Sequence, residues 1–138
     1  MAQMSNASLY LALGLPPERS NILPKLAEMN RNMKIIDVQN EVARSYAPRF
    51  FAPDDQDPHI WLSPKRVKVM VEAIAREMSA LDPDNKALYE QNAADYLAQL
   101  DEVDQEIKTA LEGVASKQII VYHPAFGYIA EDYGLTMH

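Results

Sequence analysis

Two histidines stand in sequence settings that suit metal binding. His59 lies in residues 57–64 (DPHIWLSP), and His123 lies in residues 122–128 (YHPAFGY). Proline fixes one backbone torsion angle, so the prolines of both segments stiffen the chain beside each imidazole. Rigid imidazoles from two separate segments are typical of transition-metal sites, in which geometry sets the selectivity. Two imidazoles alone are too few for a tight zinc site, which normally has four ligands.

The neighbours of His59 support a ligand role, although a structural role is also open. Asp57 can accept a hydrogen bond from the imidazole and so orient it. Trp61 can anchor the backbone against an apolar surface. The alternative is that the ring of His59 only bonds near the start of the helix that follows Ser63.

His123 is followed by a turn with small side chains. Pro124 sets the turn, and Ala125 and Gly127 leave room for another group to approach closely. A metal ligand, a general base and a ring that bonds only to the backbone all remain open for this histidine. The third histidine, His138, is the last residue and is not expected to be a ligand.

Composition and motifs exclude several other chemistries. The chain has no cysteine, which removes thiolate ligands, thiol nucleophiles and disulfides. Its formal net charge of -7 argues against nucleic acid as a partner, because phosphate binding needs basic clusters. Residues 54–65 fail as a calcium loop, since His59 and Lys65 occupy the places of the required glycine and glutamate. The sequence contains no glycine-rich phosphate loop, no membrane-spanning apolar run and no secretion signal.

The first part of the chain alternates short elements with turns. Apolar residues predict a helix over 8–15, which Gly14 and the prolines after it end. Residues 22–29 predict a short amphipathic helix, and the β-branched run at 33–38 predicts a strand. Residues 48–58 are expected to form a polar loop punctuated by proline.

Two long helices are expected next. Ser63 and Pro64 form a helix start, with a hydroxyl N-cap and a proline in the first turn. The helix that follows has an apolar stripe at Val67, Val71, Ile74, Met78 and Leu81. A second helix over 86–111 should be about 39 Å long, which is typical of a helix that connects two bodies. Its stripe is Leu88, Tyr96, Leu100, Val103, Ile107 and Leu111, and its acidic residues, Asp104 among them, are expected on a solvated face.

The end of the chain predicts one strand and one helix. Residues 118–122 have the pattern of a buried strand, and residues 125–133 predict a helix that Gly134 ends. His123 would then follow the carboxyl end of a strand, where α/β folds place ligands. The interior of a larger α/β protein and a complete, mostly helical domain with short strands both fit this pattern.

Three stretches of the sequence resemble a known family. Residues 8–16 (SLYLALGLP) look like its early helix and turn, and residues 57–64 look like its second-ligand motif. Residues 123–128, continuing through 132–135, look like its third-ligand motif. The family is that of the metal-binding solute-binding proteins of ABC transporters, in the zinc and manganese cluster that includes the periplasmic zinc-uptake proteins.

This resemblance implies an α/β fold of two lobes joined by a long helix, of which the present chain would be a mostly helical piece with few parallel strands. Residues 1–85 would be the C-terminal part of the first lobe, residues 86–112 the linking helix, and residues 113–138 the first strand–helix unit of the second lobe. The resemblance also implies that His59 and His123 bind the metal between the lobes. The family's other ligands, an earlier histidine and a later carboxylate, have no match here, so an internal piece with an incomplete site is expected.

The resemblance implies a function without enzymatic chemistry. The parent protein would capture a divalent metal in the periplasm or another extracytoplasmic space and deliver it to an ABC-transporter permease. Histidine at position 123 favours zinc, with manganese or iron as alternatives. A zinc-dependent hydrolase, or a piece with no metal function of its own, are the competing hypotheses. Cut sheets would leave open strand edges and uncovered apolar faces, so the piece is expected to form homo-oligomers.

Overall fold

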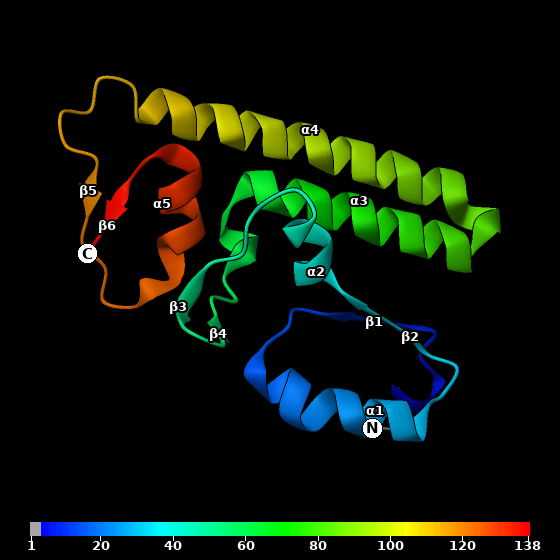
Figure 1. Cartoon of the computed structure of the whole chain (residues 1–138). Helices are drawn as coiled ribbons and strands as arrows, with labels where there is room; N and C mark the ends of the chain where they lie inside the picture. Colours follow the sequence, from blue (N-terminus) through cyan, green and yellow to red (C-terminus); the bar gives the residue numbers. More distant parts are fainter. Residues whose placement is uncertain (1–3) are drawn as a thin grey trace.

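A computed structural model describes residues 4–138 of the chain (Figure 1). Two long antiparallel helices, α3 (Pro64–Leu81) and α4 (Lys86–Ala110), run along one side. The chain before them forms β1 (Leu9–Ala12), α1 (Leu23–Met29), β2 (Lys34–Asp37), α2 (Val38–Ala43), β3 (Phe50–Ala52) and β4 (Asp55–Gln56). The chain after them forms β5 (Gln118–Ile119), α5 (Gly127–Tyr133) and β6 (Thr136–Met137).

The strand β1 occupies a segment that the sequence predicts as helix. It pairs in parallel with β2, in a register that sets Leu9 opposite Lys34 and Ala12 opposite Asp37. The prediction of a helix over 8–15 is therefore wrong, whereas the strand predicted at 33–38 is confirmed. Gly14, with a φ of 70°, and the prolines after it leave too few residues for a stable helix. Pairing with a distant strand then decides the conformation.

Residues 48–58, expected to form a loop, contain the antiparallel hairpin β3–β4. Asp54 lies in its turn with a φ of 65°, a left-handed conformation that aspartate tolerates better than most residues. The backbone N–H of Asp57 donates to the carbonyl of Arg49 over 2.9 Å and closes the hairpin just before His59. The sequence does not reveal this pairing because the strands are very short and their register is irregular.

The bounds of α3 and α4 agree with the sequence signals, but parts of their surroundings do not. Ser63 occupies the N-cap position of α3, yet its hydroxyl makes no cap hydrogen bond, so that part of the prediction is wrong. Three of the six residues in the stripe predicted for α4 are exposed, because α3 is the main neighbour of this helix, whereas Leu100 is buried. The exposed fractions are 56% for Leu88, 48% for Tyr96 and 41% for Val103.

The hydrophobic core lies where α2, α3 and α5 meet. Its buried members are Val38 and Val42 of α2, Met70 of α3, Tyr128 of α5, and Ile60 in a 3-10 helix at Ile60–Leu62. Full burial of an aliphatic side chain of this size contributes about 1.5–3 kcal/mol. The 3-10 helix directly follows His59, and α5 begins shortly after His123. One core therefore fixes both histidine-bearing segments.

The C-terminal unit is a short sheet of two parallel strands, β5 and β6, and α5 connects them in the sequence. Gln118 pairs with Thr136 and Ile119 pairs with Met137. The buried strand predicted at 118–122 is too long: β5 ends at Ile119, and Ile120 is 89% exposed. Within residues 4–138, β5 has β6 as its one neighbouring strand. Gly134, with a φ of 69°, ends α5 as predicted.

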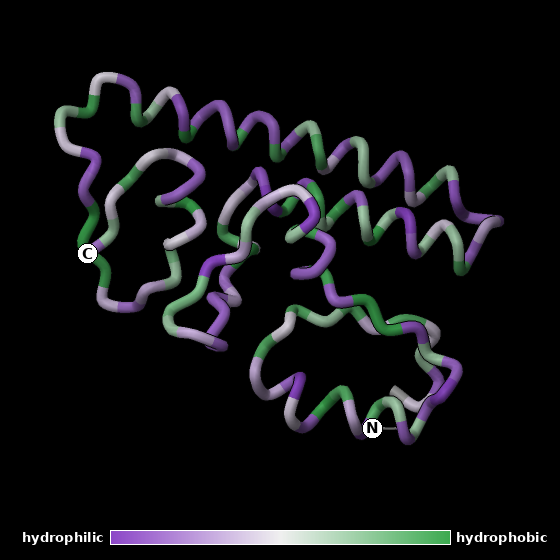
Figure 2. The backbone as a smooth tube through the Cα atoms, in the orientation of Figure 1, coloured by the Kyte–Doolittle hydropathy of each residue, from purple (hydrophilic) through white to green (hydrophobic). Residues whose placement is uncertain are grey.

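Hydrophilic residues recur along both long helices (Figure 2). Among residues 4–138, none of the helices combines the length with the continuous apolar surface that a membrane span requires. The parallel pairs β1–β2 and β5–β6, together with the surrounding helices, give the mostly helical α/β fold predicted from the sequence.

Candidate metal centre

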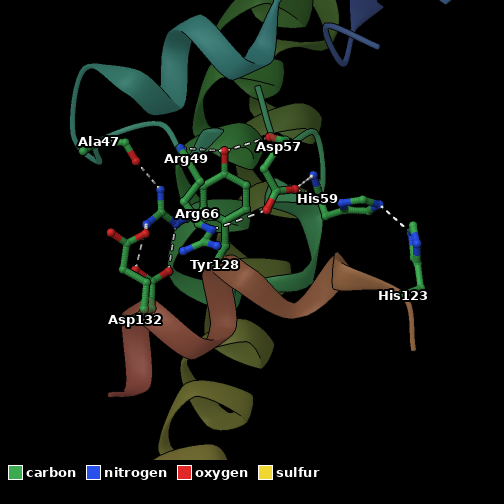
Figure 3. A network of polar contacts seen from close by, with 9 residues as sticks. Ala47, Arg49, Asp57, His59, Arg66, His123, Tyr128 and Asp132 are labelled. Carbon is green, nitrogen blue, oxygen red and sulfur yellow. Dashed lines mark hydrogen bonds and ion pairs between the residues drawn. The ribbon is translucent and has the colours of Figure 1, made fainter. Parts of the chain in front are cut away.

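The structure brings His59 and His123 together, although they lie 64 positions apart in the sequence. Their Nε2 atoms lie 3.2 Å apart, and the rings meet edge to face with centroids 5.0 Å apart (Figure 3). Two imidazoles bound to one tetrahedral zinc ion place their nitrogen atoms about 3.3 Å apart, given zinc–nitrogen bonds of about 2.0–2.1 Å. The separation of the two rings therefore suits a shared metal ion.

Asp57 fixes the orientation of the His59 ring. Its Oδ1 atom accepts a hydrogen bond from the backbone N–H of His59 over 3.0 Å and lies 2.8 Å from the ring Nδ1. A neutral imidazole that donates from Nδ1 keeps the lone pair of Nε2, which is the atom that faces His123. The contact expected between Asp57 and His59 is thus present, and it leaves Nε2, which here forms a hydrogen bond with Nε2 of His123, on the side of the ring where a metal could replace that bond.

Asp57 is itself held by groups from two other segments. Its side chain is fully buried, and its Oδ2 atom accepts a hydrogen bond from Nε of Arg49 over 3.4 Å. The hydroxyl of Tyr128 donates to the carbonyl of Asp57 over 2.8 Å and accepts from the backbone N–H of Arg49 over 3.1 Å (Figure 3). Burial raises the pKa of Tyr128, which keeps this hydroxyl protonated as a donor.

His123 lies at the surface, at the start of a 3-10 helix formed by Pro124–Phe126. The backbone N–H of Ala125 donates to the carbonyl of His123 over 2.8 Å, so the turn predicted here is present. Gly127 does allow a close approach: a Cβ at this position would lie 2.4 Å from Nε of Arg49. The group that uses this space is the guanidinium that holds Asp57.

Aromatic side chains surround the ring of His59. Trp61 packs against it with centroids 5.4 Å apart, and Phe51 lies 6.4 Å away in an edge-to-face arrangement. Trp61 remains 38% exposed, so it is not the backbone anchor that the sequence suggests. Its neighbour Ile60, which is 2% exposed and part of the core, has that role.

The other candidate ligands lie outside this pair. His138 forms backbone hydrogen bonds with Ile119 and Val121 beside β5. The acidic residues Asp54 and Asp55 lie in the turn and second strand of the hairpin. Within residues 4–138, no group of three or more histidine, cysteine, aspartate or glutamate side chains is placed to hold a metal ion.

Sequence reasoning did not find the groups that support the pair. Arg49 and Tyr128 hold Asp57, as described above. Arg66 and Asp132 form a second buried connection nearby (Figure 3). Tyr128 and Asp132 both lie within the segment that resembles the third-ligand motif, and this is the one signal that could have pointed to them. Nothing local marks the two arginines, because their partners are distant in sequence.

Comparisons with known proteins agree with the motifs. The family model for ZnuA, described as the periplasmic component A of the zinc-uptake complex, matches residues 1–138. The high-affinity zinc uptake system protein ZnuA of Bacillus subtilis is 42% identical over 79 residues, which are 57% of this chain and 25% of that protein.

Solved structures extend the likeness to nearly the whole chain. A crystal structure of ZnuA has a TM-score of 0.84 and 40% identity, with 99% of this chain and 51% of that chain covered. The crystal structure of Zn(II)-bound AdcA from Streptococcus pneumoniae has a TM-score of 0.78 and 29% identity, with coverage of 99% and 29%. The present chain thus spans about half or less of these proteins. The α/β fold class and the family predicted from the motifs are confirmed, and the chain belongs to the ZnuA family of periplasmic zinc-uptake components.

Proposed function

We propose that this chain takes part in extracytoplasmic capture of a divalent transition metal, with zinc as the preferred cargo, for delivery to an ABC-transporter permease. The observation that carries the proposal is the 3.2 Å separation between Nε2 of His59 and Nε2 of His123. The relatives that share its fold include a protein named for high-affinity zinc uptake and a structure described as Zn(II)-bound.

The donor set favours zinc. Imidazole suits zinc, copper, iron and nickel, whereas magnesium, calcium and manganese prefer carboxylate and carbonyl oxygen. His59 and His123 would fill two of the four positions around zinc, so further donors are needed for tight binding. Manganese and iron are alternative cargoes that would gain most from an additional carboxylate.

The arrangement favours capture over catalysis. A metallohydrolase needs a general base beside the metal-bound water. Within residues 4–138, the one carboxylate bonded to the histidine pair is that of Asp57, which contacts Nδ1 of His59 on the far side of the ring from His123. Its second oxygen is engaged by Arg49. The proposed role therefore includes no bond cleavage.

The proposed organisation follows the positions of the histidines. Residues 1–85 would belong to one lobe, residues 86–112 would be the linking helix that contains α4, and residues 113–138 would begin a second lobe. In support, His59 precedes the α3–α4 pair and His123 follows it. Metal capture would then use one histidine from each lobe.

We also propose that the isolated chain self-associates. The support is the exposure of large apolar side chains that a second copy could cover, such as Ile120 and Leu88, which are 89% and 56% exposed. Multi-angle light scattering should give a mass larger than one chain. A single species at 15.6 kDa would contradict this part of the proposal.

Zinc titration by calorimetry tests the metal site. The tag-free chain, His59→Ala and His123→Ala are compared, and His138→Ala is the matched control because the described contacts of His138 are backbone hydrogen bonds. Loss of either proposed ligand should weaken zinc binding by at least about tenfold, whereas His138→Ala should bind as the parent does. Equal zinc binding by all four proteins would contradict the proposal.

A further inference from the structure

Asp132, on α5, connects this helix to the start of α3. Its Oδ2 atom accepts hydrogen bonds from Oγ of Ser63 over 2.5 Å and from Nε of Arg66 over 2.9 Å. Its Oδ1 atom accepts a third, from Nη2 of Arg66, over 3.0 Å. The carbonyl of Asp132 also accepts from Nζ of Lys65 over 2.7 Å. Four hydrogen bonds therefore join one residue of α5 to three residues at the start of α3.

This connection is buried, and Arg66 has further partners around it. The side chains of Arg66 and Asp132 are 3% and 7% exposed. The remaining donors of Arg66 reach the carbonyl of Ala47 over 2.9 Å and a carboxylate of Glu131 over 3.2 Å. The guanidinium also stacks on the ring of Tyr128, 4.3 Å from its centroid. Such a bidentate, desolvated pair allows little movement between the two helices.

The residues that are joined lie close to the two histidines along the chain. Ser63 is separated from His59 by the single 3-10 turn Ile60–Leu62. Asp132 lies on the helix that follows His123 and its 3-10 turn Pro124–Phe126. In Figure 3 the contact between Asp132 and Arg66 lies at one end of the network, and the pair of His59 and His123 lies at the other.

Tyr128 makes the second connection between the same segments. Its hydroxyl donates to the carbonyl of Asp57, two residues before His59. The segment that carries His59 and the segment that carries His123 are thus bonded to each other at two points, near Asp57 and near Ser63. Relative rotation of the segments, which would separate the imidazoles, requires that at least one of these buried connections breaks.

We propose that Asp132 is a positioning residue for metal binding: by holding Ser63 and Arg66 it sets the gap between His59 and His123 before the metal arrives. This inference rests on the proposed function for its effect on zinc, but not for its effect on the two rings. Preset ligands bind more tightly because no free energy is needed to bring them together.

The test compares Asp132→Asn and Ser63→Ala with the control Glu131→Gln. Glu131 contacts the same guanidinium, but its side chain is 47% exposed. The first readout, on metal-free protein, is the set of nuclear Overhauser contacts between the His59 and His123 rings. These contacts should be lost or strongly weakened in Asp132→Asn, reduced in Ser63→Ala and unchanged in Glu131→Gln. Ser63→Ala removes a single hydrogen bond and carries the test if Asp132→Asn does not fold.

The second readout is zinc affinity, measured with and without His123. Asp132→Asn should weaken zinc binding by about tenfold in the parent chain and leave it within about twofold in the His123→Ala background, since no second imidazole is then left to position. If Asp132 only stabilised the fold, Asp132→Asn would weaken zinc binding by the same factor in both backgrounds, and that result would overturn the proposal. Unchanged ring contacts in folded Asp132→Asn would overturn it as well. If neither His59→Ala nor His123→Ala changes zinc affinity, the proposed function fails. The ring contacts alone then decide whether Asp132 positions the two histidines.

Discussion

Tyr133 donates a 2.7 Å hydrogen bond to Asp104 and thereby ties α5 to the long helix α4. Asp104 is 7% exposed, so its expected place on a solvated helix face is wrong. Burial alone would raise the pKa of Asp104, but hydrogen bonds from Lys108 and Tyr133 outweigh it and lower that pKa. In Tyr133, burial and the bond to Asp104 both raise the pKa above its ordinary value near 10. The pair therefore links stability to pH at both ends of the scale.

Tyr133→Phe should reduce stability at neutral pH and remove part of the alkaline sensitivity. A hydrogen bond to a charged group contributes about 1.5–3 kcal/mol. Because the folded pKa of Tyr133 is raised, its contribution is complete below the ordinary pKa and is lost as pH rises through the folded value. Urea unfolding between neutral pH and pH of about 11 should show a steeper alkaline decline for the parent than for the variant.

Tyr122→Phe is the control for this prediction, since Tyr122 is fully exposed. It should leave both the free energy of unfolding and its alkaline slope unchanged. Equal alkaline slopes for the parent and Tyr133→Phe would show that the bond to Asp104 does not govern this range.

Glu77→Gln should make the protein less sensitive to acid. The hydrogen bond from Lys34 lowers the pKa of Glu77, with Arg76 adding to it against the opposing effect of burial. A carboxylate with a lowered folded pKa stabilises the fold above its ordinary pKa, and this contribution is lost as pH falls through the folded value. The free energy of unfolding should therefore fall less steeply below a pH of about 4.5 in the variant.

Glu72→Gln on the same helix is the comparison for Glu77, because Glu72 is exposed. Its acid decline should match that of the parent. A decline in Glu77→Gln as steep as in the parent would mean that the contact between β2 and α3 carries no pH-dependent free energy.

The bounds of the long helices are predicted well because residues near each helix end determine them. Pro64 and the break at Asp82 and Pro83 mark the ends of α3, and the structure places them there. The strand β1 was missed because its conformation depends on pairing with β2, more than twenty residues away. The exposure of Ile120 was missed for a similar reason, since an apolar pattern does not tell whether another part of the chain packs against it.

The face of α3 that is most buried also differs from the predicted one. The stripe from Val67 through Ile74 to Met78 is only half-buried. The buried face follows Arg66, Met70, Ala73 and Glu77, with charged residues at both ends. A periodicity argument assigns charged side chains to solvent. It contains no information on the ion pairs that Asp132 and Lys34, from distant segments, form with Arg66 and Glu77. The meeting of the two histidines was anticipated from their rigid sequence settings and from the family resemblance, and periodicity gave no sign of it.

Gly127→Ala should weaken both the fold and the histidine pair. The new methyl group would lie 2.4 Å from Nε and 2.7 Å from Cζ of Arg49, and the guanidinium would have to leave Asp57. The guanidinium is the flexible end of its side chain and can turn away, so the cost is the lost contact with the buried carboxylate of Asp57, about 1–3 kcal/mol. In an Arg49→Ala background the same substitution should cost much less, since the clashing group is absent. Thermal unfolding of the parent, the two single variants and the double variant gives the coupling free energy between the two substitutions. Strictly additive effects on stability would contradict the steric account.

Asp57→Asn should lower zinc affinity by about tenfold to a hundredfold with a smaller effect on ring packing. The carboxylate of Asp57 lies 2.8 Å from Nδ1 of His59 and is fully buried, so it can hold the proton on Nδ1 and leave Nε2 for the metal. An amide is a weaker acceptor and can turn its NH₂ group toward the ring, which favours the other tautomer. Asp55→Asn, on the exposed hairpin, is the matched control and should bind zinc as the parent does. Calorimetric titration of the three proteins separates the outcomes: if Asp57→Asn and Asp55→Asn bind equally well, the buried carboxylate has a structural role and does not tune His59 for the metal.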